Sequence, residues 1–160
     1  MGWAWVWRWA PALLWFLVVS GLSSEAFSAE ETGALLLPLL QWLFPGLTGA
    51  GLEALHFALR KAGHVTEFAV LTLLWYRALA WGRSGWQGRA AAVSALLAAG
   101  FAAVDEAHQA FTVTRTASVV DVGWDVLGAL LGLGGLWLVL SVRGWSGPSR
   151  GYQDGVGDGP

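Results

Sequence analysis

The sequence contains no cysteine, and only 12% of its 160 residues are charged. Without cysteine there is no disulfide, no thiolate metal ligand and no cysteine nucleophile. A soluble domain is typically about one-quarter charged, so the shortage of charge argues against a soluble protein. A net charge of -2 gives no support for nucleic-acid binding. The sequence also lacks a P-loop, a dinucleotide-binding glycine pattern and a nucleophile elbow, which excludes the enzyme classes built on those motifs.

Apolar residues are abundant instead, at 56% of the chain, with a mean hydropathy of +0.54. Four segments approach the roughly 20 residues that cross a membrane, and tryptophans cluster near their ends as in interfacial belts. These segments are residues 5–21, 62–81, 90–111 and 122–140. The pattern predicts an all-α polytopic membrane protein with four transmembrane helices. A cleaved signal peptide is the alternative for the first segment; its tryptophans and the three later spans favour an uncleaved helix.

The connection between the first two spans contains a further helical signal. Ser28 and Glu31 have capping-box spacing ahead of an apolar run that ends at Pro45 and is interrupted by Pro38. The run is too short to span, so we predict an interfacial or re-entrant helix. Residues 1–143 then form one transmembrane domain, and the Gly-rich residues 144–160 form a disordered tail.

Basic residues predict the orientation, because arginine and lysine accumulate on the cytoplasmic side. Arg8 is near the start of the first span, Arg77, Arg83 and Arg89 lie at or near the connection between the second and third, and Arg143 follows the fourth. Both termini are therefore expected in the cytoplasm of a bacterial inner-membrane protein. Arg60, Lys61 and Arg115 then fall on the outer side, against the rule, and need another explanation.

Carboxylates at a similar depth supply that explanation. The helical rise places Asp105 about 22 Å and Glu67 about 21 Å from the cytoplasmic boundary, and Asp125 about one turn inside the outer end of the fourth span. An unpaired charge there costs several kcal/mol, by rough estimate. We therefore expect Arg60, Lys61 and Arg115 to compensate Asp105, Glu106, Asp121 and Asp125.

Helical periodicity places these residues on facing surfaces. His64 and Glu67 share a face with Arg60, and Asp105 shares one with His108 and Gln109. The fourth span has a stripe made of Asp121, Asp125, Gly128, Gly132 and Gly135. The GxxxG spacing within that stripe permits close helix contact. The predicted arrangement is a polar cluster above a glycine seam.

Two segments, RKAGHVTEFAVLTLL and DEAHQAFTVTRTASVVDVGWDVLGALLG, resemble the VanZ-like membrane proteins. The resemblance covers roughly residues 18–132 and has both motifs in the family's order. It implies functional positions at Arg60, Lys61, His64, Glu67, Asp105, Glu106, Gln109, Phe111, Arg115 and Asp121. Asp125 stands where the family usually has asparagine. The resemblance implies a cell-envelope protein, one founding member being linked to teicoplanin resistance, and it names no reaction.

The polar residues allow several interpretations. His64 and Glu67 could be an acid–base pair or could only orient a buried helix. Asp121 and Arg115 could close a loop as an ion pair or contact an anionic headgroup. A metal site can be drawn with Glu106 and His108, but these point about 160° apart on a helix, so we predict neither a metal nor a cofactor.

Three functions follow from these interpretations. The first is binding of an envelope lipid or amphiphile through Arg60, Lys61 and Arg115, which would modulate glycopeptide sensitivity. The second is an intramembrane enzyme for a lipid-linked substrate, with His64 or Glu67 as base and Glu106 as acid. The third is a small proton-coupled transporter, which would need a homo-oligomer to enclose a path. The expected partner is a membrane lipid or amphiphile.

Overall fold

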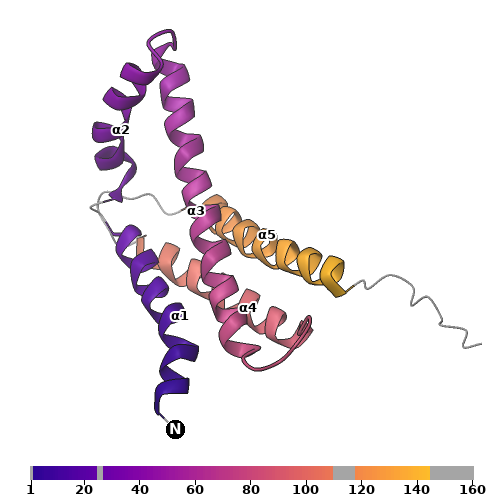
Figure 1. The fold of residues 1–160 in the computed structure, drawn as a ribbon. Coiled ribbons are helices and arrows are strands. Elements are labelled where there is room, and N and C mark those ends of the chain that lie inside the picture. The colour runs from indigo at the N-terminus through magenta and orange to yellow at the C-terminus, as the bar shows by residue number, and fades with distance from the viewer. Residues whose placement is uncertain (1, 25–26, 110–117, 145–160) are drawn as a thin grey trace, which may run out of the picture.

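The computed structural model describes residues 2–24, 27–109 and 118–144, which form five α-helices and the connections between them (Figure 1). They are α1 (Gly2–Leu22), α2 (Ala29–Leu43), α3 (Gly49–Leu79), α4 (Gly88–Gln109) and α5 (Val119–Gly144). The all-α prediction is confirmed. In Figure 1, α2 and the first half of α3 form an antiparallel hairpin that projects from a bundle of α1, α4, α5 and the rest of α3. The central helix α3 packs against each of the others.

Three of the described helices, α1, α4 and α5, are long and apolar enough to cross a membrane. The chain is therefore a multi-pass membrane protein. The helix α3 contains the second predicted span but is not among the three, and five charged residues are spaced along it: Glu53, Arg60, Lys61, Glu67 and Arg77. The predicted four-span arrangement is thus supported for three spans only. The predicted tail lies almost entirely outside the described residues.

The helix α2 begins where the capping signal predicts. The Ser28 side chain accepts a hydrogen bond from the Glu31 amide at 3.2 Å and so satisfies one free N–H of the first turn. Pro38 lies inside the helix instead of interrupting it, and α2 continues to Leu43. Loss of one backbone hydrogen bond at Pro38 does not end the helix.

Glycines of α5 make the close helix contact that the GxxxG spacing predicted, and the structure identifies α3 as the partner. A Cβ atom added to Gly128 would lie 2.3 Å from the Val65 carbonyl oxygen, and one on Gly132 would lie 3.0 Å from that of Ala69. Only glycine permits the first approach, because real Cβ atoms do not come within 3.0 Å of other heavy atoms. The prediction that Gly135 belongs to the same contact surface is wrong, because a Cβ atom added there would meet nothing within 4 Å.

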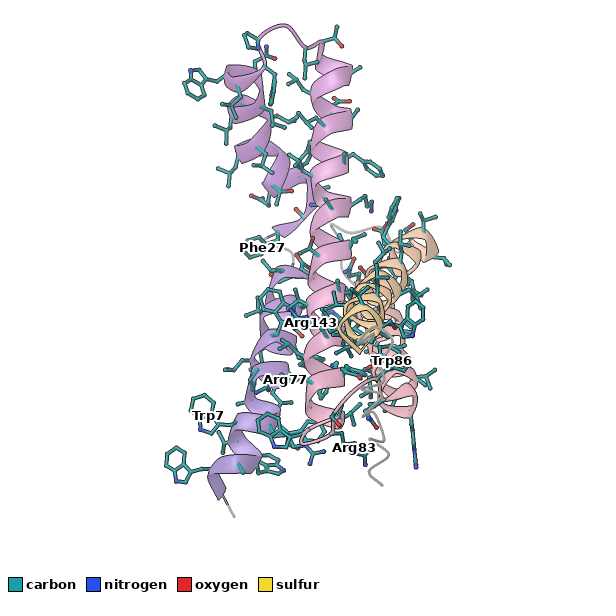
Figure 2. All side chains as sticks on the ribbon, turned by 45° about the vertical axis from the view of Figure 1, so that its right-hand side comes forward. Trp7, Phe27, Arg77, Arg83, Trp86 and Arg143 are labelled. Atoms are coloured by element: carbon teal, nitrogen blue, oxygen red, sulfur yellow. The ribbon has the colours of Figure 1, made fainter. Side chains whose placement is uncertain are left out.

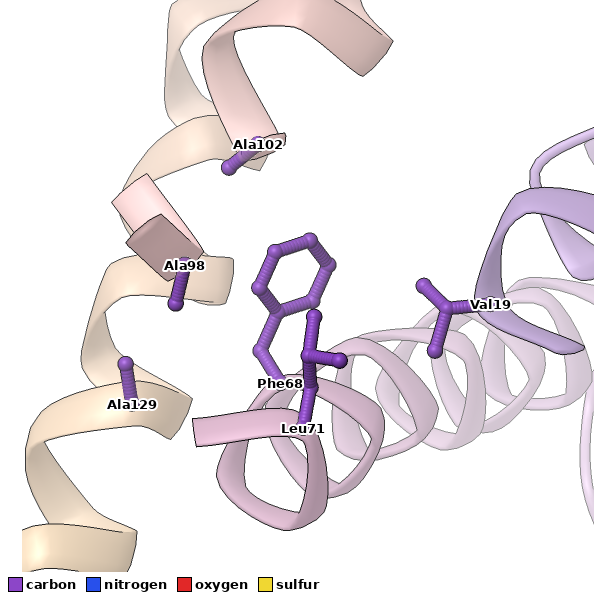
Figure 3. Close-up of a cluster of buried hydrophobic side chains, with 6 residues drawn as sticks. All are labelled: Val19, Phe68, Leu71, Ala98, Ala102 and Ala129. Atoms are coloured by element: carbon purple, nitrogen blue, oxygen red, sulfur yellow. The ribbon is translucent and has the colours of Figure 1, made fainter. Parts of the chain in front are cut away.

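Small side chains on α4 complete the core. Figure 3 shows Phe68 and Leu71 of α3 facing Val19 on one side and alanines of α4 and α5 on the other. The alanines are Ala98, Ala102 and Ala129. Because alanine adds little bulk, the helix backbones can lie close together around the Phe68 ring.

At the end of α3 away from the hairpin, arginines join α1 to α3. Arg8 Nε donates to the Ala78 carbonyl at 2.7 Å, and Arg77 Nη1 donates to the Trp7 carbonyl at 3.2 Å. The first bond satisfies a carbonyl of the last turn of α3, which has no partner within the helix. Figure 2 shows Trp7, Arg77 and Arg83 near this end, and Phe27 farther up the molecule.

Candidate functional site

A cavity of about 140 Å³ lies at the base of the hairpin, where α1 ends, α2 begins and α3 passes. Its polar lining residues are Ser23, Thr32, Arg60, His64 and Glu67. Its other lining residues are Leu22, Phe27 and Gly63. Three residues of the predicted polar cluster on α3 therefore share one cavity with an apolar rim.

The guanidinium of Arg60 is oriented by the start of α2. Its Nη1 atom donates to Thr32 Oγ1 at 2.9 Å and to the Phe27 carbonyl at 3.2 Å. The buried His56, one turn earlier on α3, has Nε2 3.4 Å from the same Thr32 hydroxyl. Burial, and next the positive charge of Arg60, lower the pKa of His56. The neutral imidazole is therefore the favoured form beside Arg60.

His64 connects the cavity to a buried carboxylate of α5. Its Nδ1 lies 3.0 Å from Asp125 Oδ1, and the Asp125 side chain is only 5% exposed. A carboxylate bonded to one ring nitrogen fixes the orientation of an imidazole and favours a proton on that nitrogen. The close approach at Gly128, one turn after Asp125, brings the two helices near enough for this contact.

Lys61 faces α5 rather than the cavity. Its Nζ lies 2.5 Å from Asp121 Oδ1, and the two side chains are 12% and 26% exposed. This contact confirms that a cation at the start of the second predicted span pairs with a carboxylate of the cluster. Asp121 thus has a described partner on α3, and the predicted partner Arg115 lies outside the described residues.

Lys61 meets the expected carboxylates at Asp121 of α5 rather than on α4, and the contacts described at Asp105 come from neutral groups. Asp105 Oδ2 accepts hydrogen bonds from Ser23 Oγ at 2.7 Å and from Gln109 Nε2 at 2.8 Å. A hydroxyl and an amide therefore solvate this carboxylate, and the hydroxyl comes from the residue that directly follows α1. Ser23 was missed because its position just after an apolar span suggests only a loop.

Two further predicted residues of α4, Glu106 and His108, are not among the described residues that line the cavity. Glu106 accepts a hydrogen bond from the backbone amide of Ser118, which begins the approach to α5. His108 is exposed, so it does not join Asp105 as its helical face suggested. Phe111 and Arg115 lie outside the described residues. Thr32 and Phe27 were missed as lining residues, since α2 has no motif that points to α3.

Within residues 2–24, 27–109 and 118–144, no group of three or more histidine, aspartate or glutamate side chains is arranged to hold a metal ion. The carboxylates are distributed over different contacts: Asp121 with Lys61, Asp125 with His64, and Asp105 with Ser23. What converges at the cavity is one guanidinium, one imidazole and one carboxylate.

Spanning helices with a polar cavity at one end define a helical multi-pass membrane protein with an intramembrane or interfacial polar site. The chain belongs to the VanZ/LLP1 family, whose family model matches residues 8–140. The resemblance drawn from the two polar motifs is thereby confirmed, over a longer stretch than those motifs cover. No curated protein and no solved structure matches the chain.

Proposed function

We propose that the protein binds the anionic headgroup of an envelope lipid or amphiphile in the cavity beside Arg60. The observation that carries this proposal is the Arg60 guanidinium, oriented by Thr32 and Phe27 on the cavity wall. A guanidinium has five N–H donors, so it can serve protein acceptors and a ligand at once. Its planar fork suits phosphate or carboxylate, and the apolar rim of Leu22 and Phe27 suits a hydrocarbon chain.

The size of the cavity supports a headgroup rather than a whole lipid. Its volume of about 140 Å³ is many times the roughly 10–15 Å³ that one water needs. It is also well below the roughly 300–1,000 Å³ of sites that enclose drug-sized molecules. The polar group would therefore enter, while the chains remain in the membrane alongside α1 and α2.

Binding is tested with purified protein in nanodiscs made from a bacterial lipid extract, with bound molecules identified by native mass spectrometry. We expect Arg60→Gln to lose a bound anionic amphiphile that the unmodified protein retains. Phosphatidylglycerol and palmitate, supplied separately, distinguish phosphate from carboxylate recognition. Arg89→Gln, the same change at an exposed position of α4, is the control. Equal retention by both variants would refute the proposal.

The cavity is proposed to face the outer leaflet, since arginines gather at the opposite end of α3. The absence of cysteine makes a direct labelling test available. Gly46→Cys at the tip of the hairpin should react with a membrane-impermeant maleimide in intact cells, and Ser84→Cys only after lysis. The reverse result would place the cavity at the inner leaflet.

A role in glycopeptide sensitivity follows from binding at the outer leaflet and is tested in cells. Strains with and without the gene are compared for sensitivity to lipoglycopeptides and detergents. We expect the protein to change sensitivity and Arg60→Gln to abolish the change. Identical sensitivity across several envelope-active compounds would contradict this role even if headgroup binding is found.

One observation favours an intramembrane enzyme as the second candidate. His64 lines the cavity with Nδ1 bonded to Asp125, and Glu67 lines the same cavity. An imidazole held this way can use Nε2 as a general base toward water or a hydroxyl, which typically contributes 10²–10⁴-fold to a rate. Glu67, rather than the predicted Glu106, would then be the nearby acid.

Incubation of the protein with labelled lipid-linked precursors distinguishes the enzymatic function from the binding function. An enzyme would form product that His64→Gln loses by roughly 10²–10⁴-fold while the variant still retains bound amphiphile. Asp125→Asn tests whether the charge of the carboxylate is required, because asparagine can still accept a hydrogen bond from Nδ1. Absence of product with the unmodified protein and a range of precursors would leave the binding function alone.

A further inference from the structure

A second cavity lies at the other end of α3 and has a volume of about 480 Å³. Its walls come from the last turns of α3, the connection to α4 and the later part of α5. The connection turns through Gly82 and Gly85, whose φ angles of 76° and 70° favour glycine. This volume falls in the range of roughly 300–1,000 Å³ that encloses ligand-sized molecules, unlike that of the Arg60 cavity.

Among the residues that the structure describes, the charged lining of this second cavity is entirely positive: Arg77 and Arg83 contribute the cations, and no carboxylate is present. Arg77 is fixed by its bond to the Trp7 carbonyl and by its position over the Trp81 ring, 4.6 Å from the centroid. Arg83 is exposed in the connection. The eight carboxylate residues in the described part of the chain all lie outside this lining. An anion is therefore the complementary ligand.

The rest of the lining is apolar and suits hydrocarbon. Leu73, Leu136 and Leu140 form a wall between α3 and α5, and α5 is a candidate membrane span. Trp81 and the nearby Trp86 are partly exposed beside the arginines, as aromatic residues are at the level of lipid headgroups. The cavity therefore joins a cationic region at headgroup depth to an apolar wall that continues into the membrane.

We propose that this cavity binds an anionic phospholipid. Its phosphate would contact Arg77 and Arg83, and its acyl chains would lie along Leu73, Leu136 and Leu140. Basic pockets between transmembrane helices are known to hold anionic headgroups, and arginine matches the geometry of phosphate. A soluble anion would leave the leucine wall uncovered, and a neutral lipid would leave both cations without a counter-charge. This site does not depend on the function proposed for the Arg60 cavity.

The test exchanges lipids into the full-length protein in phosphatidylcholine nanodiscs and titrates phosphatidylglycerol, with bound lipid counted by native mass spectrometry. We expect Arg83→Gln to weaken retention of one phosphatidylglycerol by roughly tenfold to a hundredfold. Arg83→Lys should retain part of the affinity. Leu140→Trp, which fills the cavity and keeps its charge, should also release this lipid. Circular dichroism confirms that each variant remains folded.

The controls separate this site from general charge effects and from the other cavity. Arg89→Gln removes an exposed arginine at the start of α4 and should leave retention unchanged. Arg60→Gln should remove a different bound molecule, so each cavity can fail independently. Equal retention of phosphatidylcholine and phosphatidylglycerol, equal losses in the Arg83 and Arg89 variants, or full competition by glycerol phosphate would each overturn the proposal.

Discussion

The two ends of α3 carry similar cations in opposite surroundings. At the hairpin end, Lys61 pairs with Asp121, and Arg60 shares a cavity with Glu67. At the other end, Arg77 lies over a tryptophan ring, and Arg83 lines a cavity whose described residues include no carboxylate. The neighbours, rather than the number of basic residues, therefore distinguish the two ends. The Lys61–Asp121 pair fixes α3 to α5, whereas the described lining around Arg83 supplies no carboxylate to compete with an anionic ligand.

Separating α3 from α5 should have the largest effect on stability, because the contacts of His64 and Lys61 with α5 depend on the close approach of these two helices. Gly128→Ala places a Cβ atom against backbone, which cannot rotate away as a side chain could. We expect a loss of about 3 kcal/mol in unfolding free energy, the upper part of the usual range for overpacking. Unfolding in detergent micelles by titration with SDS measures it. Gly134→Ala, where nothing lies within 4 Å, is the matched control and should be nearly neutral.

Removing the charge of Lys61 should have the next largest effect. Lys61→Met leaves Asp121 without its cation, and we expect a loss of about 2 kcal/mol. Fully buried pairs lose roughly 3–5 kcal/mol, and the 12% and 26% exposure of these side chains reduces the cost. Arg83→Met at the other end should change stability by less than about 0.5 kcal/mol. If the losses in Lys61→Met and Asp121→Leu simply add in the double variant, the two residues are not coupled.

Asp105→Ala should have the third largest effect on stability. The substitution removes the acceptor of Ser23 Oγ and one acceptor of Gln109 Nε2, and the loss of such hydrogen bonds costs about 1–2 kcal/mol. Thermal unfolding in detergent measures the effect, with exposed Glu53→Ala as the control. A change no larger than that of the control would show that water replaces the carboxylate and that α1 is not fixed through Ser23.

The smallest expected effect is the pH dependence at His56. Because the pKa of this residue is lowered in the folded protein, the unfolded chain binds the proton more readily. Stability should therefore be complete above the ordinary histidine pKa of about 6.5 and decrease as the pH falls below it. His56→Gln should flatten that part of the curve of melting temperature against pH. An unchanged curve would show that another group causes the dependence.

The sequence predicts the components of the hairpin end better than their pairing. The aspartate and glycine stripe of α5 repeats at helical spacing, so both the close contact at Gly128 and a carboxylate near α3 could be predicted. Which cation meets which carboxylate could not. Arg60 and Lys61 are about 100° apart around α3, so one faces α2 and the other faces α5. Depth along the membrane, which the sequence supplies, does not fix the rotation of one helix against another.

The contacts of α2 and the second cavity were not predicted for a related reason. Thr32 orients Arg60 only because the hairpin folds back on α3, and no periodic pattern in α2 indicates that partner. The cavity at Arg83 arises where α5 passes the end of α3, so its lining combines residues about 60 positions apart in the sequence. Arginine and tryptophan near a helix end predict a position at the membrane–water interface, but the cavity at that position forms only because α5 packs beside α3.

The length of α3 sets where the hairpin meets the membrane. Its 31 residues extend about 46 Å, against a hydrocarbon layer of roughly 30 Å. Accommodating the whole helix would need a tilt of about 50°, beyond the range of roughly 0–40° seen for transmembrane helices. We therefore expect part of α3 to stand outside the hydrocarbon, with α2 beside it. Leu35 and Trp42 of α2, 78% and 76% exposed, would then rest among the headgroups and set the height of the Arg60 cavity within the leaflet.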